Sequence, residues 1–439
     1  MARGLGAVFA LIAGSLAVAR AEERPIALAE AMALAAKANP ELQAAALRVD
    51  AQLARAESVR RARWPRATVE SAWSRTDLPA GVFASKLNSG AFTAADFDPA
   101  RLNDPDALSH LGTTAVLELP IDVFGKIGAG ATAMAAQGDA AAAGTRDATE
   151  EIRLRVAETY RQAEVAGRTV EVTQRVLAVA KAREAEIEAR VDAGGALKAD
   201  LLRARARRRE READVAERRS QQQMAQARLS RLLGAPDGVT YVPTEAPPAV
   251  GALAGAEADW TARALRQRPV LEAARRRQDA AAAVAKTEKN GLLPDLGGYA
   301  LVSDDRISGG SSQAWAVGLG LRWTPFDAGR GKREAAAVAE QRAAEQDARA
   351  AADQVRLDVA LAYRRAVAAR ERHAAASGGA EEGREALRVV QERRKAGMAT
   401  LTDELETETA ALGAALAELA AAADVAVADA ALARAAGEN

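Results

Sequence analysis

Short motifs in this chain occur twice, in the same order. The repeated pairs are Asn39-Pro40 and Arg268-Pro269, Trp64-Pro65 and Leu293-Pro294, Pro120-Ile-Asp122 and Pro325-Phe-Asp327, and Ala193-Gly194 and Ala396-Gly397. The offset is 229 residues for the first two pairs, 205 for the third and 203 for the fourth. A duplicated unit of this length predicts two similar structural halves that bury one another's apolar faces.

The duplication predicts how the chain is divided. The first structural repeat spans residues 22–237 and the second spans 258–439, with an inter-repeat segment at 238–257. Residues 1–21 read as a signal peptide, with an apolar core from Leu5 to Val18 and small residues at the Ala19-Arg20-Ala21 cleavage site. That core is short for a membrane helix, which needs about 20 residues, although an uncleaved anchor is the alternative.

The composition favours long helices. Alanine dominates, aromatic residues make up 3%, and 60 basic residues balance 60 acidic ones. This is the profile of solvent-exposed helices that pack through small residues. No basic stretch is interleaved with aromatic residues, so we expect no nucleic-acid partner. The absence of cysteine excludes disulfides and a lipidated N-terminal cysteine.

Helical periodicity and turn residues predict the same plan in both repeats. We expect helices at 27–63, 126–192 and 200–232, and again at 258–292, 329–395 and 403–436. A β-hairpin lies within each repeat, at 66–122 and at 295–325, and the polar stretch 77–112 reads as a long loop. Apolar positions such as Ile152, Val156 and Ala163 follow heptad spacing, which predicts a coiled-coil seam.

The clearest strand alternates between two kinds of side chain. Its apolar face consists of Trp315, Val317, Leu319, Leu321 and Trp323. A membrane β-strand needs about 9–11 residues, and aromatic residues mark both membrane interfaces. We interpret this face as lipid-facing; a half-buried strand of a soluble sheet is the alternative. No later segment has 18 uninterrupted apolar residues, so any further entry into a membrane is expected as strands.

These elements together predict an oligomer. Four strands cannot close a barrel, and an open edge is not tolerated in lipid. A dimer gives eight strands with a filled interior, whereas a trimer gives 12 strands around an aqueous lumen. In each repeat two shorter helices match the long one in total length, which gives rods about 100 Å long at 1.5 Å per residue.

The order and spacing of these motifs resemble the TolC-like outer-membrane factors, the outer membrane efflux protein family. The proline after each rising helix, the Pro-x-Asp after each hairpin and the Ala-Gly-x5-Asp at each helical tip carry the resemblance. It implies a mainly α fold with a small membrane β part. As a homotrimer this would form a 12-stranded outer-membrane β-barrel on a 12-rod periplasmic α-helical coiled-coil barrel.

The resemblance also implies a function and partners. The chain would be the outer-membrane exit duct of a tripartite efflux pump or type I secretion system. It would conduct cargo passively and work with a periplasmic adaptor (membrane fusion protein) and an inner-membrane transporter. A periplasmic coiled-coil adaptor or tether without a membrane barrel is the competing hypothesis.

The helical tips are the candidate functional sites. The resemblance places gate-lining acids at Asp403 and Glu406, and Asp200 occupies the equivalent place at the first tip. Acids in a first helical turn also favour the helix dipole, so capping is the alternative role. The turn residues expected to contact the adaptor are Gly194, Leu197, Gly397, Thr400 and Leu401. Arg and Tyr residues latch the entrance in some relatives, but Ala399 and Arg394 stand at the matching places, so that latch is not carried over.

Chemistry on the cargo is not expected. Two isolated histidines, His110 and His373, do not have the spacing of a metal site. No nucleophile-elbow, phosphate-loop or zincin pattern occurs. We therefore predict no enzymatic activity, no cofactor and no metal.

Overall fold

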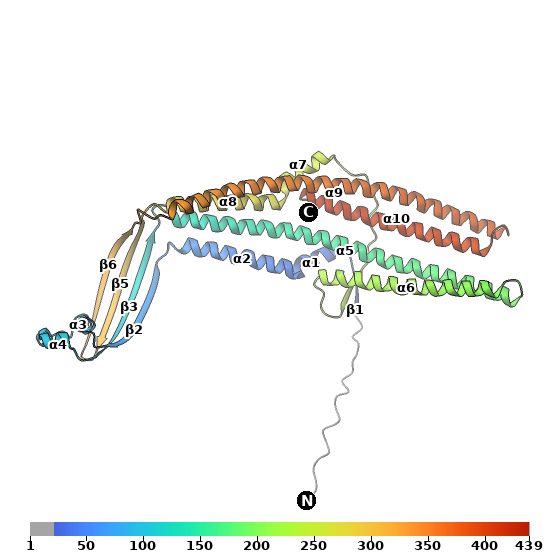
Figure 1. Cartoon of the computed structure of the whole chain (residues 1–439). Coiled ribbons are helices and arrows are strands. Elements are labelled where there is room, and N and C mark those ends of the chain that lie inside the picture. The colour runs from blue at the N-terminus through green and yellow to red at the C-terminus, as the bar shows by residue number, and fades with distance from the viewer. Residues whose placement is uncertain (1–21, 439) are drawn as a thin grey trace, which may run out of the picture. The chain divides into compact units, whose positions relative to one another are not determined.

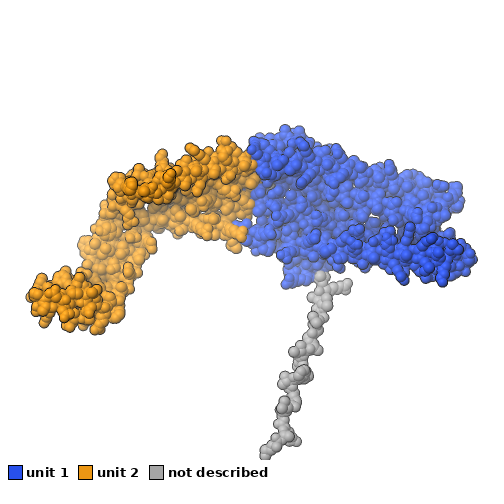
Figure 2. All heavy atoms as spheres, in the orientation of Figure 1, with its two compact units in different colours: residues 1–45, 146–268, 353–439 blue, residues 46–145, 269–352 orange. Residues whose placement is uncertain are grey.

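The computed structural model describes residues 22–438. The predicted signal peptide, residues 1–21, lies outside the described residues. Two compact units share the chain (Figure 2): residues up to 45, 146–268 and from 353 form unit 1, and residues 46–145 and 269–352 form unit 2. The division into repeats at 22–237 and 258–439 stays a prediction, since each unit takes parts of both. The prediction of a mainly helical fold with a small β part is confirmed.

Unit 2 contains a four-stranded antiparallel sheet with strand order β2-β3-β5-β6 (Figure 1). The strands are β2 (Arg66–Thr76), β3 (Leu108–Ile121), β5 (Asp295–Ile307) and β6 (Gly310–Arg322). All four were expected, but the first five residues of β3 lie within the stretch 77–112 that was predicted as a loop. Trp323 lies one residue beyond the end of β6.

The segment between β2 and β3 is more ordered than the sequence suggested. It contains α3 (Pro79–Asn88), the 3-10 turn η1 (Ala94–Phe97) and α4 (Pro99–Asn103), so the prediction of a plain loop at 77–112 was wrong. The phenyl rings of Phe83 and Phe97 both pack edge-on against Phe92, with centroids 4.8 and 5.1 Å away. The Asp96 carboxylate accepts hydrogen bonds from Thr93 and from Lys86 Nζ. These local contacts stabilise helices too short to show a periodic pattern.

The helices of unit 2 approach one another through small residues. They are parts of α2 (Pro40–Arg61), α5 (Lys126–Asp192) and α9 (Arg330–Lys395), together with α8 (Pro269–Asn290). A Cβ atom added to Gly138 of α5 would lie 2.9 Å from Leu53 Cδ2 of α2. Five alanines of α5 are buried nearby: Ala129, Ala133, Ala136, Ala140 and Ala143.

Two predicted helices are each broken in two. The chain forms α1 (Leu28–Ala38) and α2 where one helix was expected at 27–63, and α7 (Glu257–Gln267) and α8 where one was expected at 258–292. The breaks fall at Asn39 and Arg268, which both adopt extended backbone before a proline. Asn39 Oδ1 accepts the backbone N–H of Glu41 at 2.9 Å and so caps the next helix. The first helix of each pair, α1 or α7, has 11 residues, and the second, α2 or α8, has 22.

Unit 1 consists mainly of helical hairpins. One pairs the C-terminal part of α5 with α6 (Lys198–Leu232), and the other pairs α9 with α10 (Leu401–Ala436) (Figure 1). The long helices α5 and α9 have 67 and 66 residues. The predicted seam is confirmed in its central part, where the buried positions are Ile152, Val156, Ala163, Val170, Val355, Val359, Ala362, Ala366, Ala369 and Ala380.

A short parallel strand pair also belongs to unit 1. It joins β1 (Glu22–Ile26) to β4 (Val239–Pro243), and neither strand was predicted. The fully buried Tyr160 of α5 fixes this region. Its hydroxyl donates to Ile26 O at 3.0 Å and accepts the backbone N–H groups of Thr244 and Glu245 at 3.1 and 3.0 Å.

Candidate functional sites at the helical tips and on the sheet

The first tip joins α5 to α6 in unit 1. Gly194 adopts φ +75°, a left-handed conformation that ends the helix, and the Gly195 N–H donates to Arg190 O at 2.7 Å. Leu197 is exposed at the start of α6 and provides no side-chain cap. Asp200 lies in the first turn of α6, and its Oδ1 is 3.3 Å from Arg203 Nη1 on the same helix.

The second tip joins α9 to α10 and is capped more strongly. Gly397 has φ +74°, and Thr400 is the N-cap of α10. The Thr400 hydroxyl accepts the Asp403 N–H at 3.1 Å, while Asp403 Oδ2 accepts from the Thr400 N–H at 2.9 Å and from its hydroxyl at 2.7 Å. This is a reciprocal capping box. Leu401, the first residue of α10, is half-buried.

The capping box changes the acidity of Asp403. The pKa of its carboxyl lies below the ordinary value, chiefly because the Thr400 N–H donates to it, then because of the Thr400 hydroxyl and, more weakly, the charge of Arg393. Of the two roles that the sequence left open for Asp403, the structure contains helix capping. Only Oδ2 takes part in these bonds, and the carboxylate is exposed. Asp403 can therefore cap α10 and face solvent at the same time.

Glu406 contacts the other hairpin. Its Oε1 accepts a hydrogen bond from Arg183 Nη1 of α5 at 2.9 Å, and the two side chains are 61% and 28% exposed. Two residues earlier in α10, the Glu404 carboxylate pairs with Arg394 of α9. The three predicted gate acids thus have three different partners: a cap residue, an arginine of the other hairpin and an arginine of the same helix.

The sheet of unit 2 has one continuous apolar face. On β6 this face consists of Trp315, Val317, Leu319 and Leu321, which are 65–77% exposed. Trp315 pairs with Val302 of β5, which pairs with Ala115 of β3, which in turn pairs with Val69 of β2. Residues paired directly across strands point to the same side, so the face crosses all four strands. Trp323 extends it, and its Nε1 donates to Leu292 O at 3.0 Å.

The opposite face of the sheet is more polar, although it also includes Val116, Tyr299 and Leu301. It presents Glu70, Glu118 and Asp305 together with Gly318 and Gly320. His110 Nε2 and Asp305 Oδ1 lie 2.7 Å apart on this face. A Cβ atom on Gly318 would lie 2.7 Å from the Tyr299 ring, so this ring covers the glycine. An apolar face opposite a polar one is the pattern of a sheet between lipid and water.

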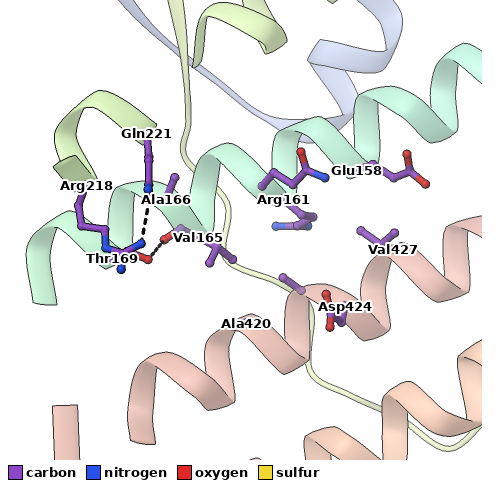
Figure 3. Close-up of a pocket in the computed structure, with 12 residues that line it drawn as sticks. Glu158, Arg161, Val165, Ala166, Thr169, Arg218, Gln221, Ala420, Asp424 and Val427 are labelled. Atoms are coloured by element: carbon purple, nitrogen blue, oxygen red, sulfur yellow. Dashed lines mark hydrogen bonds between the residues drawn. The ribbon is translucent and has the colours of Figure 1, made fainter. Parts of the chain in front are cut away.

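Unit 1 also contains a cavity of about 560 Å³ between α5, α6 and α10 (Figure 3). Arg161 and Asp424 lie on its α5 and α10 walls, respectively. Arg161 is buried and donates to Glu164 at 2.7 Å and to Glu245 O at 2.8 Å, and burial raises the pKa of Glu164. The Thr169 hydroxyl donates to Val165 O and has no base beside it among the hydrogen bonds of the cavity. The arrangement has the character of a structural ion pair.

Comparison with known families decides where the chain belongs. The model of a family described as outer membrane efflux protein matches residues 31–235 and 260–438. The chain belongs to the outer membrane efflux protein family. The resemblance read from the motifs is confirmed, and so is the outer membrane as the location of the protein. The match is interrupted around the predicted inter-repeat segment, 238–257.

Solved structures show the fold of this outer membrane efflux protein. A membrane protein from Pseudomonas aeruginosa is 21% identical, with a TM-score of 0.75 and 93% of each chain covered. The Campylobacter jejuni CmeC outer membrane channel is 17% identical, with a TM-score of 0.75, 93% of this chain and 85% of that chain covered. The outer membrane protein VceC from Vibrio cholerae is 19% identical, with a TM-score of 0.70, and the match covers 94% of this chain and 96% of that chain. No curated protein matches the sequence.

Two further features bear on the site. Within residues 22–438, α10 is long and apolar enough to cross a membrane by length and composition. Most of its apolar residues are alanines and it forms a hairpin with α9, so composition alone does not make it a membrane span. In the same residues, no group of three or more acidic or histidine side chains could hold a metal ion.

Sequence reasoning did not predict the arginine contacts at the tips. Arg183 and Arg394 lie on helix faces rich in charged residues, and nothing in the local pattern separates them from solvated neighbours. The Thr400–Asp403 spacing, by contrast, is the signature of a capping box and could have been recognised.

Proposed function

We propose that this protein is the outer-membrane exit duct of a tripartite efflux pump or type I secretion system, and that it conducts cargo passively without acting on it chemically. Membership of an efflux family and the continuous apolar face of the sheet support this function. The apolar face is the observation that carries the proposal, because an exposed band of this kind in a folded chain requires lipid or a partner to cover it.

The sheet also supports assembly as a homotrimer. β2 and β6 are the edges of the sheet, and neither has a further strand partner in the described residues. Lipid cannot satisfy the free N–H and C=O groups of an edge, so the edges must pair with those of other copies. Three copies supply 12 strands, enough for an aqueous lumen, whereas two supply eight, whose side chains fill the interior.

The helices support the same assembly. In the most apolar stretch of α10, only 17% of the residues are buried within one chain. A helix with so much uncovered alanine surface packs closely against another helix when one is available. In the proposed trimer, a neighbouring copy covers it and the hairpins form a periplasmic tunnel of 12 rods.

The tips form the periplasmic entrance in this proposal. Asp403, Glu406 and Asp200 would line it in each copy, and rings of like charge attract cations and repel anions. The turn residues Gly194, Leu197, Gly397, Thr400 and Leu401 would contact the periplasmic adaptor, which links the duct to an inner-membrane transporter. The Arg183–Glu406 pair joins the two hairpins of one chain, and we assign it the closed state of the entrance.

A substitution in the sheet tests the proposal. Leu319→Arg with Leu321→Arg should abolish outer-membrane assembly, because each arginine near the midplane of the bilayer costs about 2–4 kcal/mol. Ala314→Arg with Ala316→Arg is the matched control, since both residues alternate with the apolar ones and face the other side of β6. Membrane fractionation and a trimer assay should show loss of assembly in the first variant alone. Normal assembly of L319R/L321R would rule out the lipid-facing strand.

A further inference from the structure

Large apolar side chains gather where the sheet of unit 2 passes into its helices. They are Trp64, Val123, Phe124, Trp323 and Phe326, and all are exposed. The Trp323 indole N–H is already bonded to Leu292 O, so its exposed ring offers an apolar surface without an unsatisfied donor. Amphipathic aromatic rings settle at the headgroup level of a membrane. This collar therefore marks the depth at which the chain leaves the lipid.

The charges around this collar are unequally paired. Six carboxylates near it have a partner: Glu57, Asp122, Glu288, Asp295, Asp327 and Glu334 contact arginine, lysine or backbone N–H groups. In the helices and at their ends, four exposed cations have no ion pair or side-chain hydrogen bond among residues 22–438: Arg63, Lys286, Lys289 and Lys332. We refer to these four as the junction cations. Arg66 and Arg322 are also exposed and unpaired in the described chain, but they lie in β2 and β6 on the polar face of the sheet. The uncompensated charge at the collar is thus positive.

The junction cations lie at the right depth for lipid headgroups. The headgroup layer on each side of the hydrocarbon core is about 5–8 Å thick. Arg63 directly precedes Trp64, and Lys289 lies three residues before Leu292, which corresponds to about 4.5 Å along a helix. Lys286 lies one turn further on the same exposed side of α8, and Lys332 is the third residue of α9.

We propose that the junction cations bind the phosphate headgroups of anionic phospholipids in the leaflet next to the helices. The charge complementarity of four unpaired cations and the continuity of the collar with the apolar face of the sheet both point to this partner. The proposal rests on the lipid-facing role of that sheet, and the experiment separates the two.

Quenching of tryptophan fluorescence by brominated lipids provides the measurement. The full protein is reconstituted in phosphatidylcholine bilayers that contain either brominated phosphatidylglycerol or brominated phosphatidylcholine. A cation close to an anionic membrane surface strengthens binding about fivefold. We therefore expect a binding preference of about fivefold or more for phosphatidylglycerol, decreasing in about 1 M salt, where the Debye length is about 3 Å. In R63Q/K286Q/K289Q/K332Q the preference should fall to about one.

A matched variant removes the same charge further along the helices. R275Q/R277Q/R342Q/R349Q changes four exposed arginines of unit 2 that also have no ion pair in the described chain. Arg342 lies ten residues beyond Lys332, and Arg277 lies twelve before Lys289, about 15 and 18 Å away. This variant should keep the preference for phosphatidylglycerol.

Three outcomes would overturn the proposal. The first is an unchanged preference in the junction variant, and the second is an equal loss in the matched variant. The third is a junction variant that loses affinity for lipopolysaccharide phosphates and keeps its affinity for phosphatidylglycerol, which would place the cations at the opposite leaflet. If neither brominated lipid quenches the tryptophans, the lipid-facing role of the sheet fails instead.

Discussion

The Arg183–Glu406 pair offers the sharpest test of how the proposed periplasmic entrance closes. It links α5 of one hairpin to α10 of the other at 2.9 Å, close to both tips. The hairpins cannot separate there without breaking the contact. Glu406→Gln keeps the size of the side chain and removes its charge, so it weakens the pair with little change in packing. We expect the variant channel to open more often.

The exposure of the pair sets the magnitude. Exposed ion pairs contribute about 0–1 kcal/mol, and with Glu406 61% exposed we take about 0.5 kcal/mol. Three symmetry-related pairs in the proposed trimer would contribute about 1.5 kcal/mol to the closed state. Since 1.4 kcal/mol is a factor of ten, we expect the ratio of open to closed channels to rise roughly tenfold.

Single-channel recording in planar bilayers measures this ratio. Glu408→Gln is the control, because Glu408 lies on the same helix and has no ion pair among residues 22–438. Arg183→Gln should match Glu406→Gln, and the double variant should add little, because both changes remove the same contact. High salt should bring the wild type toward the variants. An open fraction that does not change, or that changes equally in Glu408→Gln, would refute this reasoning.

Three further predictions follow from other parts of the chain. Replacing Asp403 and Glu406 together by alanine should lower the cation preference of the channel in bilayer recordings, and unchanged selectivity would exclude these acids from the pore lining. Tyr160→Phe removes three hydrogen bonds at a buried site, so we expect a loss of about 1–3 kcal/mol in the free energy of unfolding, measured by denaturant titration. Lys86 and Thr93 lower the pKa of Asp96 from 3.8 to about 2, so their contacts stabilise the loop above pH 3.8 and are lost as the pH falls through about 2. Between pH 3.8 and about 2, pepsin should therefore cleave the 77–107 loop of the wild type only near pH 2. It should cleave the same loop of Asp96→Asn at every pH in this interval.

Much of the fold could be predicted because local patterns report it directly. The alternation from Trp315 to Trp323 predicted β6, and the glycines at 194 and 397 predicted where the hairpins turn. Heptad spacing identified the seam of α5 and α9 as far as the central buried residues. These features depend on neighbours within a few residues or on a regular period, and a single sequence contains that information.

The remaining features depend on partners far away in the sequence. Glu22 pairs with Val239 across 217 residues, and neither β1 nor β4 has a pattern of its own. The helix breaks at Asn39 and Arg268 were missed because a proline can begin a helix as well as interrupt one. The partner of Glu406 could not be predicted, because the Arg183 contact exists only once the two hairpins lie side by side.

Electron microscopy of the protein extracted from outer membranes in detergent tests the central claim most directly. The account predicts threefold hollow particles, in which a long tube continues from a short membrane barrel. Solid rods, or soluble dimers with no membrane-embedded part, would contradict the duct and favour a coiled-coil tether.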